Sequence, residues 1–411
     1  MSAPARSIEE RPRDAAVIAL AGMAHYSSHV MQLALAPLFP LLHDHFAVSF
    51  ADLGLVMGIF YASSGLGQAA AGVLVDRYGA RRLLLGGLVL LSVAIGLMGF
   101  ATSYRMLLPL ALLGGLGNSV FHPADLSILS HRVGVSRLGR AYAVHGICGS
   151  LGFATAPVLV ALIAAFAGWR VALTAIGAGG LAVAALLYAN RALLDYRRAV
   201  PAPAPGAARP HLAYWRVVGS PVVLMGFTYF ALTAFAGTGI QTFSITALVS
   251  GYGLELPIAT LGLTLYLIGS AIGMMAGGFL AERTRQHHRV AMSGIALAAA
   301  LMLLIAGLPG GAAVPLMMLA GMASGITAPS RDVLIRQAAA GSGMGSVFGF
   351  VYSGFDLGSS IAPLLFGALI DRGAPHAVFL AIACSFAAGV PAVMQVAQRR
   401  ASRAQAPAGA D

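Results

Sequence analysis

The sequence has little charge and contains no lysine. Only 9% of its 411 residues are charged, all 25 basic residues apart from histidine are arginines, and 58% of the residues are hydrophobic. An average soluble domain is about 25% charged, so a mean hydropathy of +0.83 excludes an ordinary soluble protein. Without lysine, the phosphate-binding loop of ATP-driven enzymes is also excluded, because that loop requires a Gly-Lys pair.

Cysteine is scarce as well. Cys148 and Cys384 both lie inside apolar runs, which excludes a disulfide framework and a Cys-rich metal site. The sequence also has no His-Glu-x-x-His motif and no nucleophile elbow. It therefore predicts a protein that is not an enzyme and that needs neither a cofactor nor a metal ion.

Long apolar runs dominate what is present. Since about 20 apolar residues span a bilayer as a helix, twelve such runs predict an all-α membrane protein with twelve transmembrane helices. The first run is too long for a signal peptide and is expected to be an uncleaved span. The runs cover residues 15–42, 51–75, 83–101, 106–130, 140–166, 170–190, 217–249, 257–281, 289–308, 313–337, 345–370 and 375–397.

A proline-rich, charged stretch divides these runs into two sets of six. It contains Pro201, Pro203, Pro205 and Pro210 between Asp195 and His211, a composition typical of a linker. We therefore predict an N-terminal six-helix bundle over 1–194, a cytoplasmic linker over 195–212 and a C-terminal six-helix bundle over 213–411.

The two sets are related by a constant offset of 206 residues. One offset holds through four successive spans without a gap, and the identical pairs include Gly67 with Gly273, Arg77 with Arg283, Pro123 with Pro329 and Pro157 with Pro363. Two similar halves in the same orientation are the parallel-repeat plan of many secondary transporters, whose substrate site lies between the repeats near mid-bilayer. The repeat predicts two pseudo-symmetric bundles with a central site.

The arginines predict the orientation of the chain in the membrane. With the N-terminus in the cytoplasm, 21 arginines lie on the cytoplasmic side, three lie outside (Arg105, Arg170 and Arg372), and Arg331 falls within a span. By the positive-inside rule, this bias places both termini in the cytoplasm. The net charge of +11 therefore reflects membrane topology, and no nucleic-acid partner is expected.

The segment from Gly72 to Arg82, Gly-Val-Leu-Val-Asp-Arg-Tyr-Gly-Ala-Arg-Arg, closes the second run. It resembles the signature loop of the major facilitator superfamily, and Gly278 to Arg283 resembles a degenerate second copy. The resemblance implies the twelve-helix fold of that superfamily and a cytoplasmic gate made of Asp76, Arg77, Arg81, Arg82, Glu282 and Arg283. The alternative is a plain arginine-rich loop that only sets topology.

One span adds a narrower resemblance. Val120 to Asp125, Val-Phe-His-Pro-Ala-Asp, is similar to a segment of fosmidomycin-resistance-type exporters within the superfamily. The equivalent segment of the second half, Ala328 to Asp332, does not match that pattern. This resemblance implies an exporter but leaves the substrate open.

Polar side chains recur at helical spacing inside four of the runs. Ionisable groups at this depth cost a few kcal/mol and therefore mark ion or substrate pathways. The substrate cavity is predicted to contain His25, His29, Gln32, Asn118, Ser324, Thr327, Arg331 and Tyr352. Asn118, His122 and Asp125 fall at i, i+4 and i+7 and are expected on one helix face.

Two carboxyl groups are the candidate proton carriers. Asp125 or Asp356 would bind and release the proton, with His122 as a relay, and Arg331 would hold the carboxylate charge or bind an anionic substrate group. A structural pair between Asp356 and Arg331 is the alternative. His145, a single imidazole on an apolar helix, is expected to be a hydrogen-bonded packing residue that does not titrate.

These patterns together predict a monomeric, proton-coupled secondary transporter in the bacterial inner membrane, working by alternating access. Its partners would be protons, a small organic substrate and the lipid bilayer. The leading interpretation is export of a drug or metabolite. Uptake of a small organic anion with protons is the first alternative, and a transport-fold sensor is a weaker one.

Overall fold

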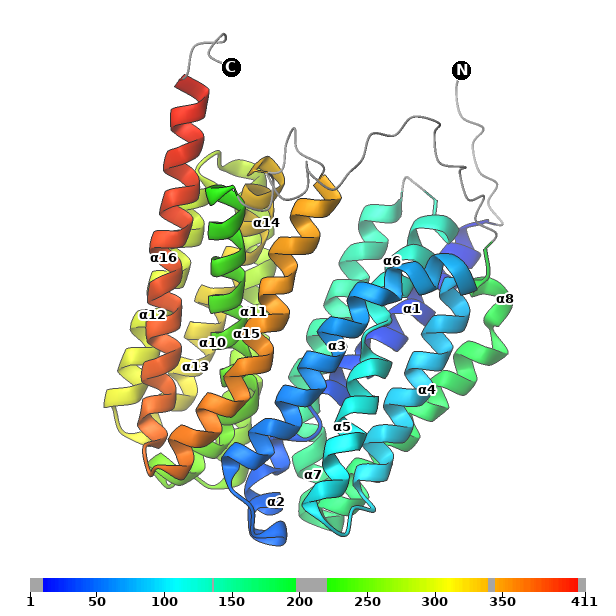
Figure 1. Cartoon of the computed structure of the whole chain (residues 1–411), viewed down its shortest axis with the longest axis vertical. Helices are drawn as coiled ribbons and strands as arrows, with labels where there is room; N and C mark the ends of the chain where they lie inside the picture. The colour runs from blue at the N-terminus through cyan, green and yellow to red at the C-terminus, as the bar shows by residue number, and fades with distance from the viewer. Residues whose placement is uncertain (1–9, 135–136, 197–219, 339–343, 406–411) are drawn as a thin grey trace. The chain divides into compact units, whose positions relative to one another are not determined.

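The computed structural model describes residues 10–134, 137–196, 220–338 and 344–405. Within them the chain is helical throughout and forms bundles of long helices (Figure 1). The elements of the first half are α1 (Glu10–Gln32), η1 (Ala36–Leu38), α2 (Phe39–Phe46), α3 (Phe50–Tyr78), α4 (Ala80–Met98), α5 (Tyr104–Asn118), α6 (Phe121–Arg132), α7 (Leu138–Ala189) and α8 (Arg191–Leu194). Those of the second half are α10 (Pro221–Tyr252), α11 (Leu256–Arg283), α12 (His287–Gly307), α13 (Gly310–Gly325), α14 (Thr327–Ala338), α15 (Met344–Asp371) and α16 (Pro375–Gln405).

Ten helices of the described residues are long and apolar enough to cross a membrane. Helix α7 counts once among them, although its 52 residues are enough for two spans. Gly168 interrupts α7 with a φ of +83°, a conformation that glycine adopts without steric cost, so the helix turns between the predicted fifth and sixth spans. The ten do not include α1; with α1 as the first span and α7 as two, the count equals the predicted twelve.

The first span ends earlier than the sequence predicted. The apolar run continues to residue 42, but α1 ends at Gln32 and the chain continues as the short elements η1 and α2. Each of these begins with a proline in its first turn, Pro37 and Pro40 respectively. Proline lacks the N–H that a continuing helix would need and is favoured at a helix start, so the prolines redirect the chain while it is still apolar.

Spans four and ten are each made of two helices. A break separates α5 from α6, and another separates α13 from α14. The second helix begins at Phe121 in one case and at Thr327 in the other, positions related by the 206-residue offset. The internal repeat therefore extends to the backbone breaks, and the polar residues of both spans lie around them.

The packing inside the two halves follows the same repeat. Helix α1 packs against α7 as α10 packs against α15, and α4 packs against α5 as α12 packs against α13. A Cβ atom on Gly115 would overlap with the carbonyl oxygen of Phe60, and one on the equivalent Gly321 would overlap with that of Tyr266. Glycine at these two positions allows the helix backbones to approach closely.

Contacts between residues divide the chain into two compact units. Unit 1 holds the described residues of 1–47 and 59–200, and unit 2 holds those of 48–58 and 201–411. The first turns of α3 belong to unit 2 because they pack on α15, where a Cβ on Gly58 would come within 3.0 Å of the Ser360 carbonyl oxygen. Most of the predicted linker lies outside the described residues.

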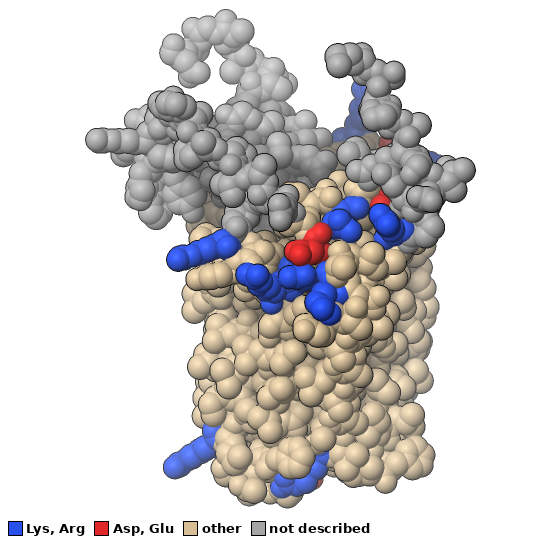
Figure 2. Space-filling model, turned by 90° about the vertical axis from the view of Figure 1, so that its right-hand side faces the viewer, with Lys and Arg blue, Asp and Glu red and all other residues tan. Residues whose placement is uncertain are grey.

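The surface of the molecule matches a protein that spans a membrane. In the view of Figure 2, charged residues gather toward the two ends, and the broad surface between them carries almost none. Large apolar side chains are exposed on many helices, among them Leu66, Leu162 and Phe279. In water such a surface would drive aggregation, whereas hydrocarbon solvates it.

Candidate functional site

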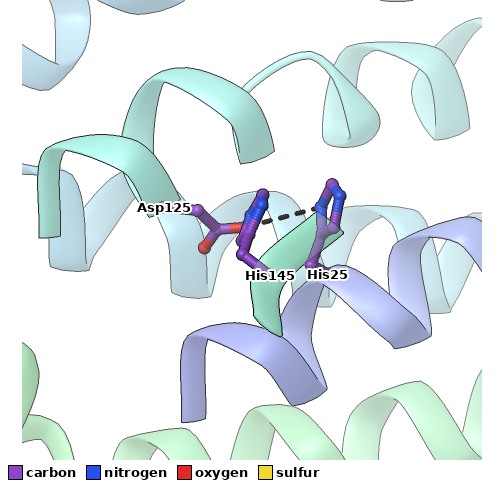
Figure 3. Close-up of side chains that lie close together, drawn as sticks. All are labelled: His25, Asp125 and His145. Atoms are coloured by element: carbon purple, nitrogen blue, oxygen red, sulfur yellow. Dashed lines mark hydrogen bonds and ion pairs between the residues drawn. The ribbon is translucent and has the colours of Figure 1, made fainter. Parts of the chain in front are cut away.

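A cluster of ionisable side chains lies inside unit 1. Asp125 on α6 is fully buried at 0% exposure, and His25 on α1 and His145 on α7 are buried at 3% and 5%. The Nε2 atom of His145 lies 3.2 Å from Asp125 Oδ2, and the Nδ1 atom of His25 lies 3.7 Å from the same oxygen. Figure 3 shows the carboxylate pointing toward the two imidazoles, with each of the three side chains on a different helix.

Two more imidazoles border this cluster. The ring of His29 is 4.3 Å from that of His25, and the ring of His122 is 5.2 Å from it. His25 and His145 stack with their ring centres 3.7 Å apart and their planes 18° from parallel. Four histidines and one aspartate thus form one continuous group, which we call the histidine cluster: His25, His29, His122, His145 and Asp125.

Close packing of α1 on α7 holds the cluster together. A Cβ on Gly152 would come within 2.9 Å of the His29 Cβ, and one on Gly149 would come within 2.7 Å of His25 Nε2. Glycine on the α7 face therefore lets the α1 imidazoles reach the middle of the bundle. The spacing of His25 and His29, one helical turn apart, directs both rings to this side.

His145 is the member of the cluster that was not predicted as a site residue. We expected it to be a hydrogen-bonded packing residue, and the structure places it in polar contact with Asp125. Imidazole and carboxyl groups both need a polar partner when they are buried. That requirement was the one indication in the sequence that His145 would contact another polar side chain. The sequence contains no information on which of the other helices supplies the partner.

The residues of the predicted polar stripe of span four have different partners. Asn118 ends α5, and its Nδ2 donates a hydrogen bond to Ser64 Oγ at 3.0 Å. His122 and Asp125 on α6 belong to the histidine cluster, and His122 is exposed. Ser119 and Val120 between the two helices keep right-handed helical backbone angles, so one shared helix face stays a prediction.

The equivalent polar residues of span ten hydrogen-bond within unit 2. The Ser324 hydroxyl lies 3.2 Å from that of Tyr266, and Thr327 donates to the Ser324 carbonyl oxygen at 2.6 Å. Ser324 and Asn118 are related by the offset of 206 residues, and each forms a hydrogen bond to the second span of its own half, α11 for Ser324 and α3 for Asn118. Both act as bridges between neighbouring helices.

Arg331 lies on α14 with its guanidinium over the ring of Phe230, 4.5 Å from the ring centre. It borders a pocket in unit 2 together with Tyr229, Leu334 and apolar residues of α12 and α16. A cation over an aromatic face is stabilised by the ring quadrupole. The side chain is partly exposed.

The other predicted cavity and proton residues are more scattered. Gln32 is half-buried at the end of α1, and Asp356 is half-buried in α15. The side chain of Tyr352 lies outside the described part of the structure. In unit 2, Ser359 accepts a hydrogen bond from Thr238 at 3.0 Å, one turn from Asp356.

The family model of the Major Facilitator Superfamily matches residues 17–313 and, in a second, overlapping match, residues 234–410. These matches extend over almost the whole chain. The chain belongs to the Major Facilitator Superfamily. It is a multi-pass membrane transporter and not an enzyme, as the sequence predicted.

The chain is similar to curated proteins whose names refer to different compounds. A probable sulfoacetate transporter of Cupriavidus necator is 24% identical over 85% of this chain and 86% of its own length. The fosmidomycin resistance protein of Escherichia coli is 24% identical over 65% of each chain. A probable L-galactonate transporter of Escherichia coli is 22% identical over 59% of this chain and 55% of its own.

Solved superfamily structures share the fold at low identity. A bacterial homologue of the human lysosomal transporter Spinster gives a TM-score of 0.72 at 16% identity, covering 94% of this chain and 96% of its own. The nucleoside transporter NupG gives 0.73 at 14% identity, covering 92% and 99%. These likenesses support the fold.

Two arginines of the superfamily loop after the second span form contacts with other side chains. Arg81 forms an ion pair with Asp195 at 3.1 Å, and Arg77 lies over the ring of Tyr78 at 5.4 Å. Arg82, Glu282 and Arg283 are exposed, while the side chain of Asp76 lies outside the described part. The Arg81–Asp195 pair connects the start of α4 to the residues just after α8.

Proposed function

We propose that this transporter is a proton-coupled exporter of a small organic compound that works by alternating access. The observation that supports this proposal is the burial of Asp125 among imidazoles inside a membrane-spanning bundle. Ionisable groups at such depth are costly and mark ion or proton pathways in transporters. The nearby carboxyl and imidazole groups offer several sites between which one proton can move.

The coupling would follow from the change in charge. Binding one proton changes the net charge of a buried cluster by one unit, and the free energy of that change depends strongly on how much water reaches the cluster. A conformational change that opens the cluster to one side of the membrane would therefore change its affinity for the proton. Alternating access supplies such a change in each transport cycle.

Asp356 is the second candidate carrier, and His122 is the proposed relay. Asp356 lies half-buried in α15, where it is partly accessible. His122 is exposed while its ring remains 5.2 Å from that of His25, so it could transfer protons between Asp125 and water. Two carriers in different units would allow the coupling to involve both halves of the repeat.

The test is proton movement in inverted membrane vesicles with an imposed pH gradient. Phosphonates, small carboxylates and lipophilic cations are added in turn to wild type, Asp125→Asn, Asp356→Asn and the control Asp44→Asn, whose side chain is exposed beyond the first span. We expect one substrate class to release protons from the acidified lumen of wild-type and control vesicles. At least one of the two buried-site variants should abolish this release. Intact coupling in both would overturn the proposed proton site.

Uptake of a small organic anion with protons is a second candidate, favoured by Arg331. Its side chain lines an apolar pocket, and guanidinium groups bind carboxylate oxygens well. Two relatives are named as probable transporters of the organic anions sulfoacetate and L-galactonate. In the same assay, substrates that carry protons into the vesicles would favour uptake over export.

The proposed placement in the cell follows from the arginine distribution. We place both termini in the cytoplasm and the chain in the bacterial inner membrane as a monomer, with bundles over 1–194 and 213–411 joined by the linker 195–212. The loop residues from Asp76 to Arg82, with Glu282 and Arg283, would form the cytoplasmic gate. Cysteine labelling from each side of the membrane tests this topology directly.

A further inference from the structure

The histidine cluster brings three potential metal ligands from three helices into contact. His25, Asp125 and His145 each offer one ligand atom, and these atoms all lie within 4.8 Å of one another. All three side chains are buried. As Figure 3 shows, the carboxylate oxygen and the two ring nitrogens face a common region.

Several polar atoms of the cluster have unused hydrogen-bonding capacity. Among the described residues, Asp125 Oδ1, His25 Nδ1 and His29 Nδ1 are buried without a hydrogen-bond partner. Leaving a buried polar atom unsatisfied costs about 1–3 kcal/mol. Three such atoms in one small region indicate that this part of the bundle is built to bind something polar.

The donor set fits a divalent transition metal, and two of its three spacings come close to those of a zinc site. Two ligands bound at about 2.0–2.1 Å to a tetrahedral zinc ion lie about 3.4 Å apart. The separations from Asp125 Oδ2 are 3.2 Å to His145 Nε2 and 3.7 Å to His25 Nδ1. The rings of His25 and His145 are stacked, so one of them would turn to bring its ligand atom toward the ion. Imidazole and carboxylate are ligands that Zn²⁺, Co²⁺ and Ni²⁺ accept, whereas Mg²⁺ and Ca²⁺ prefer all-oxygen sites.

We propose that His25, Asp125 and His145 form a binding site for a divalent transition cation of the zinc class, and that binding of the cation blocks transport. The block rests on the proposed function, while the binding site rests only on geometry. His29 and His122 are near enough to supply a fourth ligand or to orient the first three.

The block has a chemical reason. The three ligands come from α1, α6 and α7, all of which belong to unit 1, so they would move together when one half rocks against the other. A bound ion would instead occupy the Asp125 carboxylate and the two ring nitrogens that the proposed function uses for the proton. A cluster that holds the metal ion could not bind and release the proton in each cycle.

Binding is tested first, without reference to transport. Purified protein in nanodiscs is stripped with a chelator and titrated with Zn²⁺ by calorimetry and with Co²⁺ by its visible absorption. We expect about one ion per chain and an intense tetrahedral Co²⁺ band. His145→Gln and Asp125→Asn should weaken binding by at least about tenfold, since even residues that only support a ligand contribute 10–100-fold.

His288→Ala is the matched control because His288 is a partly exposed histidine on α12, away from the cluster. It should bind Zn²⁺ as the wild type does. Size-exclusion profiles and helical content establish that each variant is folded, and His25→Gln provides a second ligand variant if His145→Gln is not. Binding that is absent in the wild type, unchanged in both ligand variants, or lost in the control would overturn the site.

Transport is tested second, in wild type and His288→Ala only. Micromolar Zn²⁺ should inhibit both, and chelator should restore them. Proton-coupled transport with no metal binding would overturn this inference and leave the proposed function standing. Metal binding with transport that ignores the pH gradient would retain the site and overturn proton coupling, and bound metal without inhibition would overturn the block.

Discussion

Adding a single methyl group beside the histidine cluster tests the geometry of the site without removing any ionisable group. In Gly149→Ala, the new Cβ would lie 2.7 Å from His25 Nε2 and 2.8 Å from its Cδ2. Ordinary van der Waals contact begins at 3.4 Å, so the ring or the helix must move by about 0.7 Å. Overpacking of this kind costs about 1–3 kcal/mol.

Gly146→Ala is the control, one turn earlier on the same helix. A Cβ at Gly146 meets nothing within 4 Å, so this variant carries the gain in helix propensity, about 1 kcal/mol, without the clash. The difference between the two variants therefore isolates the strain at His25. Two responses are available to the protein, and each has its own measurement.

If the helices separate, the free energy of unfolding of Gly149→Ala falls about 1–3 kcal/mol below that of Gly146→Ala, measured by SDS unfolding in mixed micelles. If the His25 ring turns instead, stability is kept, but proton-coupled transport and Zn²⁺ affinity fall. A Gly149→Ala protein that equals the control in stability, transport and metal binding would refute the packing of α1 against α7 described above.

Two further predictions concern helix ends and the repeat. The Asp371 carboxylate accepts hydrogen bonds from the N–H groups of Phe50 and Ala51 at 2.7 and 2.8 Å. Asp371→Ala should therefore lower the free energy of unfolding by about 1 kcal/mol, as loss of a helix cap does. Asp371→Asn should lower it by less, and an equal loss in the two variants would argue against capping. Gly115→Ala and Gly321→Ala should each destabilise the protein by about 1–3 kcal/mol, because both glycines face a backbone carbonyl oxygen of the neighbouring helix. A strongly unequal effect of the two substitutions on SDS unfolding would contradict equivalent packing in the two halves.

Much of the fold could be predicted because membrane helices follow from local composition. Apolar runs set the twelve spans, and the offset of 206 residues predicted the repeat that reappears in the breaks before Phe121 and Thr327. The end of α1 was placed too late because apolar residues continue through Pro37 and Pro40. Hydropathy does not show where the chain changes direction within an apolar run. The two prolines mark that point.

The candidate site could be predicted only in part. Span depth identified Asp125, His25, His29 and His122 as costly residues in need of partners, and the structure brings them together. The sequence did not connect His145 to them, and it did not indicate that Asn118 bonds to Ser64 while Asp125 contacts two imidazoles. Periodicity predicts the helix face on which a side chain lies, but not which neighbouring helix that side chain meets.

The sequence by itself determined the class of protein, the number of spans and the repeat, because these depend on composition and on order along the chain. The gathering of an aspartate and four histidines was decided only by tertiary structure. His25, His122 and His145 lie on α1, α6 and α7, and their meeting depends on how closely those helices approach. That approach is set by small residues such as Gly149, where the absence of one methyl group leaves room for an imidazole.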